Sequence, residues 1–176
     1  MKPDIAMAHL ERILADIPDE GTILEWGSGG STVFFAENKP EAARLVTIEN
    51  DRTWWDKVMA EVYDQPATYL WLHEPEHGLR SIGGYGTHLR ENPTGQASYI
   101  CNLNIREVIR EADVIFVDGT ARGACLATAA KLKKPECTVY LHDAERGWYD
   151  WAIPLFSFTE LLPPESGHPG SLRRFI

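Results

Sequence analysis

The spacing of apolar residues divides the chain into alternating helices and strands. Ala6, Leu10 and Ile13 recur at helical spacing, which predicts an opening helix that ends before Pro18. Apolar runs bounded by turn residues predict strands at 22–26, 44–49, 68–73, 112–118 and 137–143, with two shorter ones within 156–161 and 171–176. Further helices are expected at about 31–38, 51–63 and 122–133.

This alternation predicts an α/β fold with a doubly wound, mostly parallel seven-stranded sheet and helices on both faces. The two short strands at the end of the chain are expected to form an antiparallel hairpin. Residues 112–118 are so apolar that they should lie in the middle of the sheet, buried on both faces. The length of 176 residues predicts a single domain, 1–176.

Residues 74–98 interrupt the pattern, because they contain five glycines and two prolines and show no clear period. This long loop follows a strand, so it leaves the sheet at the carboxyl edge, where open α/β folds bind ligands. Two interpretations remain open for this insertion. It is either a lid that covers a substrate or a solvated loop without a role in binding.

Composition narrows the setting of the protein. Hydrophobic residues make up 44% of the chain and the net charge is −9, so the broad basic footprint of a nucleic-acid or membrane-surface protein is lacking. Charges in the first residues argue against a signal peptide, and no apolar run reaches the roughly 18 residues of a membrane span. Three cysteines without metal-ligand spacing are typical of reduced thiols. We therefore expect a cytoplasmic protein.

The glycine-rich stretch ILEWGSGGST, residues 23–32, follows the first strand directly. It lacks the serine frame of a hydrolase elbow, the lysine of a phosphate-binding NTPase loop and the third glycine of a dinucleotide site. An acid, Glu49, ends the next strand 22 residues after Gly27, close to the offset at which a carboxylate accepts ribose hydroxyls. This arrangement favours a cofactor that has a ribose but no phosphate. A tight structural corner is the alternative.

Four strand ends resemble those of the class I S-adenosylmethionine-dependent methyltransferases, which have a Rossmann-like fold. They are LEWGSGGST (24–32), VTIEND (46–51), VIFVDGTAR (114–122) and VYLHDAER (139–146), in the order of that family. The resemblance extends from about residue 5 to the end of the chain. It implies that S-adenosylmethionine is the cofactor.

The resemblance also implies roles for individual residues. Gly27 and Gly29 would face the methionine and ribose part of the cofactor, Glu25 would orient its amino group, and Glu49 would hold the ribose. Asn50 and His73 would lie near the adenine. The complete predicted cofactor-binding set is Glu25, Gly27, Ser28, Gly29, Ser31, Thr32, Glu49, Asn50 and His73.

The fourth and fifth strand ends carry the candidate catalytic residues Asp118, His142 and Asp143. They would meet if the two strands are neighbours, and could supply a general base. A divalent metal on Asp118 and Asp143 is possible but not favoured. The similar cation-dependent O-methyltransferases end strand five with Asp-Asn rather than His-Asp, and magnesium prefers oxygen ligands. Arg122 and Arg146 either pair with the aspartates or bind an anionic substrate group.

These features predict a methyltransferase for a small, oxygen-bearing and anionic acceptor. The segment after strand four lacks the Asn/Asp-Pro-Pro-Tyr motif of enzymes that methylate the nitrogens of bases or amides, which argues against nucleic acid. The alternatives are a nicotinamide-dependent oxidoreductase and a binding module that has lost catalysis. Three aromatic residues, Trp148, Tyr149 and Trp151, are expected to serve packing rather than substrate binding.

Overall fold

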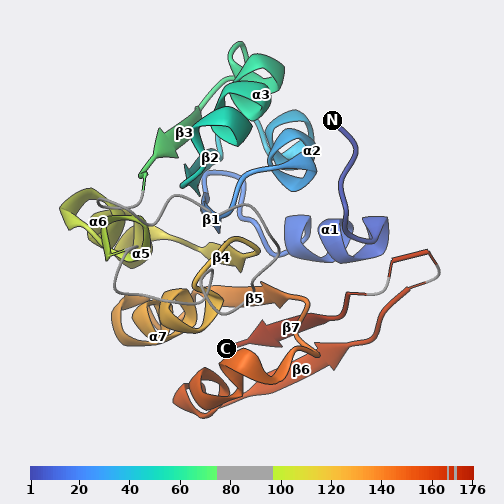
Figure 1. The fold of residues 1–176 in the computed structure, drawn as a ribbon, viewed down its shortest axis with the longest axis vertical. Coiled ribbons are helices and arrows are strands. Elements are labelled where there is room, and N and C mark those ends of the chain that lie inside the picture. Colours follow the sequence, from blue (N-terminus) through green and yellow to red (C-terminus); the bar gives the residue numbers. More distant parts are fainter. Residues whose placement is uncertain (75–96, 166, 169) are drawn as a thin grey trace.

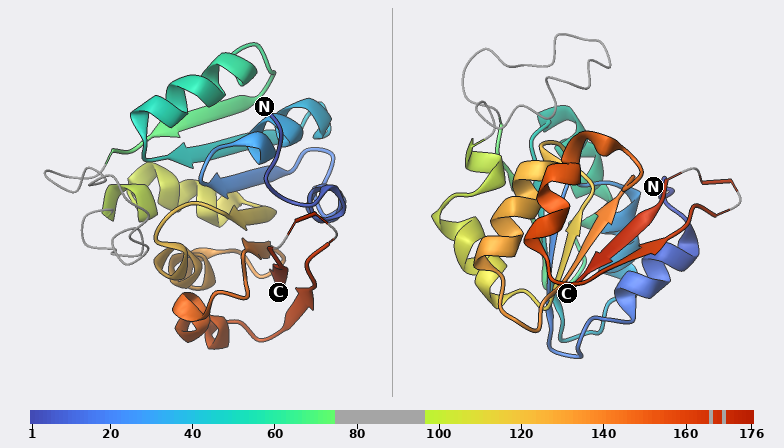
Figure 2. Two further views of the ribbon diagram at one scale, coloured as in Figure 1. Left: turned by 45° about the vertical axis from the view of Figure 1, so that its right-hand side comes forward. Right: turned by 90° about the horizontal axis from the view of Figure 1, so that it is seen from below.

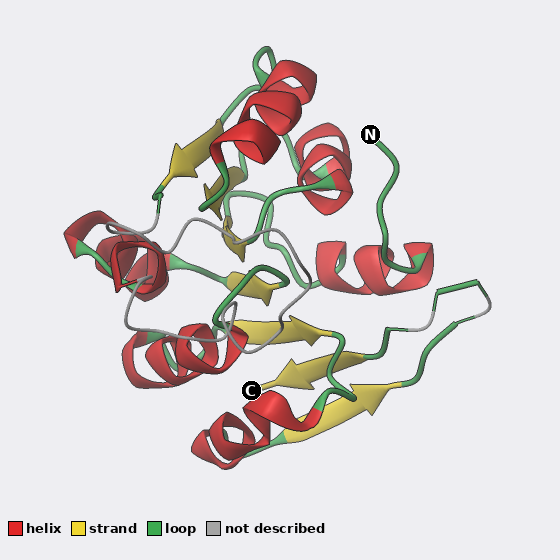
Figure 3. Ribbon diagram, viewed as in Figure 1, coloured by secondary structure: helices red, strands yellow, loops and turns green. Residues whose placement is uncertain are grey.

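The computed structural model describes residues 1–74, 97–165, 167–168 and 170–176 (Figure 1). Helices and strands alternate along these residues as predicted (Figure 3). In chain order, the elements are α1 (Met7–Leu14), β1 (Thr22–Trp26), α2 (Gly30–Asn38), β2 (Arg44–Glu49), α3 (Arg52–Val62), β3 (Thr68–Leu72), α5 (Ala97–Ile100), α6 (Leu103–Glu111), β4 (Val114–Val117), α7 (Arg122–Leu132), β5 (Thr138–His142), the 3-10 helix η2 (Gly147–Leu155), β6 (Thr159–Leu162) and β7 (Leu172–Phe175).

The strands form a seven-stranded sheet in the order β3-β2-β1-β4-β5-β7-β6. Strands β1 to β5 are parallel to one another, whereas β7 runs antiparallel to both β5 and β6. The predicted doubly wound sheet and its antiparallel hairpin at the end of the chain are therefore confirmed. In this order β1 and β4 are neighbours at the point where the winding reverses, and such a switch point is where open α/β sheets bind ligands.

Helices cover both faces of the sheet and bury a separate apolar cluster on each (Figure 2). On one face α1 and α2 pack against alternate strand residues such as Ile23 and Phe116. On the other face α6, α7 and η2 pack against the intervening residues, such as Leu24 and Val117. Because β4 is covered on both sides, its four side chains are all buried, as its continuous apolar run predicted.

Two helices begin at side chains that cap them. The Asp51 carboxylate accepts a hydrogen bond from the Trp54 N–H at 2.9 Å, which confirms the predicted start of α3. Asn102 caps α6 in the same way through the Ile105 N–H at 3.0 Å. Helix α6 is absent from the sequence prediction, although it buries apolar residues at helical spacing, because the irregular glycine-rich stretch before it obscured its start.

Several predicted boundaries differ from the structure. Strand β4 is shorter than the predicted 112–118, and the 3-10 helix η2 that follows β5 was not predicted. Most of the predicted loop at 74–98 lies outside the described residues, so the lid interpretation keeps the status of a prediction. None of the described helices has both the length and the apolar character required for a membrane span.

Candidate active site

The glycine turn joins β1 to α2, and its first two glycines differ in their backbone conformation and in their neighbours. Gly27 has a φ of 93°, and a methyl group on it would overlap the backbone of Gly119, which follows β4. Only glycine meets both conditions without strain. Gly29 is extended, with a φ of 172°. Among the described residues, the nearest atom to a methyl group on Gly29 would be Trp54 Nε1 at 4.0 Å, so these residues leave space beside the turn on this side.

Glu25 is completely buried behind this turn. Its carboxylate accepts hydrogen bonds from the hydroxyls of Ser31 (2.6 Å), Thr32 (2.7 Å) and Thr47 (2.8 Å). The Thr32 hydroxyl in turn accepts from the Gly29 N–H at 2.9 Å, so the carboxylate supports the turn from within. Burial raises the pKa of Glu25 to about 7 against the effect of the three hydroxyls. Three predicted cofactor residues, Glu25, Ser31 and Thr32, thus bond to one another.

Glu49 lies at the end of β2 and is bonded to the same turn. One of its carboxylate oxygens accepts from both the N–H and the hydroxyl of Ser28, at 2.9 and 2.8 Å. The other accepts from the N–H groups of Asn50 and Asp51, at 2.8 and 2.9 Å. The structure therefore brings the acid of the second strand and the hydroxyl of the glycine turn together. A ligand hydroxyl could take the place of the Ser28 hydroxyl on this carboxylate.

The remaining predicted cofactor residues border the same edge of the sheet. The Asn50 side chain donates to the Thr120 hydroxyl at 2.9 Å, which links the end of β2 to the segment after β4. His73, just after β3, lies 3.2 Å from the side-chain nitrogen of Asn102 before α6. Burial lowers the pKa of His73, which favours its neutral form.

Sequence reasoning missed Trp54 at this site. Its indole N–H donates to the Ser28 carbonyl at 2.6 Å, and its side chain remains partly exposed beside the glycine turn. A large aromatic residue in the first turn of α3, immediately after the strand-two acid, was the available signal. Tyr99 of α5 was also missed, because it lies at the end of the irregular segment. It is buried with its hydroxyl against Gly119.

The predicted catalytic residues Asp118, His142 and Asp143 do gather at the adjacent ends of β4 and β5. One ligand atom from each lies within 4.8 Å of the others, and His142 Nδ1 is 2.9 Å from the Asp118 carboxylate. Burial alone would lower the pKa of His142, but the hydrogen bond and charge of Asp118 raise it overall. The backbone of Gly170 covers the other ring nitrogen of His142, since a methyl group there would come within 2.5 Å of Nε2.

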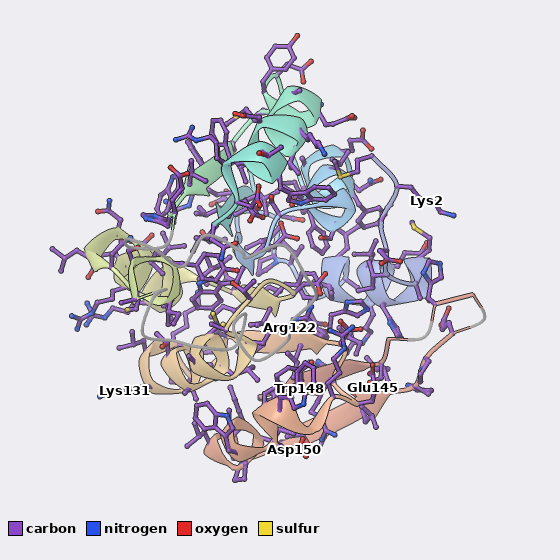
Figure 4. The ribbon with its side chains drawn as sticks, in the orientation of Figure 1. Lys2, Arg122, Lys131, Glu145, Trp148 and Asp150 are labelled. Carbon is purple, nitrogen blue, oxygen red and sulfur yellow. The ribbon has the colours of Figure 1, made fainter. Side chains whose placement is uncertain are left out.

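Arg122 binds the ends of both strands at once (Figure 4). Its guanidinium donates to the Asp143 carboxylate at 2.9 Å and to the carbonyls of His142, Asp118 and Gly119 at 2.6–2.9 Å. It also forms an ion pair with the Asp118 carboxylate at 3.1 Å. Of the two interpretations of Arg122, the structure shows pairing with the aspartates.

Arg146 pairs with the same Asp143 oxygen at 2.8 Å, but its side chain is 47% exposed, against 10% for Arg122. One face of Arg146 is therefore open to a ligand.

Burial alone would raise the pKa of Asp118, but the charge of Arg122 and the hydrogen bond of His142 lower it overall.

The aspartate pair is a poor fit for a divalent cation. Arg122 already bonds to both carboxylates, so a metal ion would have to displace a buried guanidinium. The inner ring nitrogen of His142 is engaged by Asp118, and its outer nitrogen is covered by Gly170.

Two of the three predicted packing aromatics differ from expectation. Tyr149 is buried and donates to the Asp143 carbonyl at 2.7 Å, as a packing role requires. Trp148 and Trp151 are 45% and 60% exposed, although Trp151 lies against Gly123 of α7. Packing within the described residues therefore covers only part of the surface of these two tryptophans.

No protein-family model matches the chain, and no curated protein matches its sequence. Its structure is similar to those of several methyltransferases. A methyltransferase-like protein from Silicibacter pomeroyi is 22% identical, with a TM-score of 0.61 over 99% of this chain and 89% of that one. An O-methyltransferase from Bacillus cereus, in complex with S-adenosylhomocysteine, is 15% identical (TM-score 0.63; 98% and 82%). An rRNA methylase from Streptococcus thermophilus is 12% identical (TM-score 0.62; 95% and 92%).

The chain therefore has the fold of class I S-adenosylmethionine-dependent methyltransferases, as its four strand ends predicted. These neighbours differ in the acceptors that their names give, which include RNA.

Proposed function

We propose that this protein is a methyltransferase that binds S-adenosylmethionine at the β1–α2 turn and methylates a small acceptor. One observation carries the proposal. The open side of Gly29 and the Glu49 carboxylate lie on the same turn, joined through Ser28. Such a turn lets the backbone approach a ligand, and the carboxylate can accept its ribose hydroxyls.

The residues of the site fit this cofactor. Glu49 and Ser28 would hold the ribose, Asn50 and His73 would border the adenine, and Gly27 and Gly29 would face the methionine part. The neutral form of His73, favoured by its burial, suits a position beside an uncharged base. When bound, the cofactor supplies a methyl group on a positively charged sulfur. The protein supplies alignment and the exclusion of water.

The acceptor would lie beside the Asp118, His142 and Asp143 cluster. Asp118 is the member of this cluster with the most exposed side chain. Its hydrogen bond to His142 provides a group with which it can exchange a proton. Because Arg122 holds the pKa of Asp118 low, Asp118 is a weak base. An acceptor oxygen that is already ionised, such as a carboxylate or an acidic phenol, therefore fits best. Arg146 would bind an anionic group of that acceptor through its exposed face.

Calorimetry with S-adenosylmethionine, S-adenosylhomocysteine and NAD tests the cofactor. We expect binding of the first two and none of NAD, whereas a preference for NAD would support the oxidoreductase and overturn the proposal. Formation of S-adenosylhomocysteine with pools of small carboxylates and phenols then tests the acceptor. Turnover with RNA alone would refute the small-molecule assignment, and cofactor binding without any turnover would indicate a binding module.

A further inference from the structure

We infer that Glu25 acts as a buried negative charge that makes the site prefer the cationic S-adenosylmethionine over its neutral product. This inference rests on the proposed function, and it assigns Glu25 a role without direct contact. Its carboxylate is fully buried and accepts hydrogen bonds from three hydroxyls. It would therefore act through its electric field from behind the turn.

The geometry around Glu25 preserves its charge without neutralising it. Ser31 and Thr32 of α2 and Thr47 of β2 are neutral donors, so they stabilise a carboxylate but leave its net charge in place. The ion pairs found among the described residues do not include Glu25. Because Glu25 has no exposed surface, solvent screens its electric field only weakly within the protein.

A charged group that acts on Glu25 lies just after β4. The charge of Asp118 opposes ionisation of Glu25, and Asp118 is itself paired with Arg122. On its other sides, α2 and β2 present the three hydroxyls, and β4 presents Phe116 in register with Glu25. The charge of a ligand bound beside the turn is therefore the main factor that changes the ionisation of Glu25.

The two cofactor forms differ by one charge at the sulfur. During transfer the bond from sulfur to the methyl carbon breaks and a bond from the acceptor oxygen to that carbon forms. The bonding electrons stay on sulfur, which becomes a neutral thioether. A cation beside the turn would favour ionised Glu25, and loss of that charge would remove the attraction. Charges roughly 10 Å apart at the effective dielectric of a protein change a binding constant about tenfold.

Proton release on binding is the direct test. Because burial raises the pKa of Glu25 to about 7, this residue is partly protonated at neutral pH before a ligand binds. Calorimetry at pH 7 in two buffers of different ionisation enthalpy should show release of up to about half a proton with S-adenosylmethionine and almost none with S-adenosylhomocysteine. The affinity for S-adenosylmethionine should rise by up to about tenfold from pH 6 to pH 8, while that for the product stays level.

Two variants identify the residue responsible. Glu25→Gln should abolish the proton release and reduce the preference for S-adenosylmethionine. The control Glu37→Gln removes the same charge from the exposed end of α2 and should behave as the wild type does. Unchanged proton release in Glu25→Gln would overturn the inference.

The wild-type comparison remains decisive even if Glu25→Gln fails to fold. Equal proton release by both cofactor forms would overturn the role of Glu25 and leave the proposed function intact. Binding of neither form would instead overturn the proposed function, and this inference with it.

Discussion

At the scale of single residues, the carboxylates at the site have opposite surroundings. Glu25 is enclosed and, among the described residues, accepts from three hydroxyls, whereas Glu49 accepts mainly from backbone N–H groups at the rim of the glycine turn. The two glycines of the turn differ in a similar way, because Gly27 is packed against Gly119 and Gly29 borders open space. Substitution of a single residue can therefore test each difference.

Glu49→Ala should weaken the binding of S-adenosylmethionine by about 10- to 100-fold. The variant loses hydrogen bonds from the ribose to a charged group, each worth roughly 1.5–3 kcal/mol. Calorimetry measures the affinity, and circular dichroism checks that the variant is folded. Glu41→Ala removes an exposed carboxylate just before β2 and serves as the control. Native affinity in Glu49→Ala would show that Glu49 does not hold the ribose.

Alanine at Gly27 and at Gly29 should separate folding from binding. Gly27→Ala forces a methyl group into the backbone of Gly119 at a φ of 93°, so we expect a loss of stability above about 1 kcal/mol. Gly29→Ala has room for its methyl group and should fold normally, but that methyl group occupies the side on which the cofactor would lie. Urea unfolding and calorimetry measure the two effects. Native cofactor affinity in Gly29→Ala would contradict the proposed binding side.

At the scale of elements, one arginine joins three of them. Arg122 begins α7 and bonds to groups at the ends of β4 and β5, so it fixes the relative position of the candidate catalytic side chains. The same carboxylate of Asp143 also pairs with Arg146, which is exposed. The pair of arginines therefore offers a matched comparison of a buried and a surface ion pair.

Arg122→Ala should reduce the free energy of unfolding by about 3–5 kcal/mol, because it removes the buried cation that pairs with both Asp118 and Asp143. Arg146→Ala should cost less than about 1 kcal/mol, since its ion pair is half exposed. Urea titrations of both variants measure the difference. If Arg146→Ala keeps full turnover with an anionic acceptor, Arg146 does not bind that acceptor.

At the scale of the whole molecule, the strand order brings distant residues to one edge of the sheet. Glu25 on β1 lies between β2 and β4, and its hydroxyl partners come from residues up to 22 positions away. Burial of this carboxylate therefore lowers the free energy of unfolding of the whole protein, by an amount that depends on pH.

The free energy of unfolding of the wild type should fall relative to Glu25→Gln as the pH rises from 5 to 8. Burial raises the pKa of Glu25 from 4.5 to about 7, so the folded state binds a proton that the unfolded state has already released. Between these two values stability decreases with pH, by about 2 kcal/mol over the stated range. Urea unfolding of both proteins at several pH values measures this difference. A constant difference would show that Glu25 ionises normally in the folded protein.

The sequence by itself determined the order of the strands and the bounds of the first two. Apolar runs predict β1 and β2 with the observed bounds, because strands buried on both faces are rich in apolar residues. The acid at the end of β2 and the glycine turn were likewise visible as local patterns. Helix α6 was not, since the irregular segment before it hides its start.

Only the tertiary structure decided which way the polar side chains of the site face. Glu25, Ser31 and Thr32 share a motif with Gly29, yet their side chains bond to one another, because the turn brings the first residues of α2 back over β1. Arg122 pairs with Asp143 from 21 positions away because β4 and β5 are neighbours. Such contacts depend on strand adjacency and on burial, which no local pattern of residues specifies.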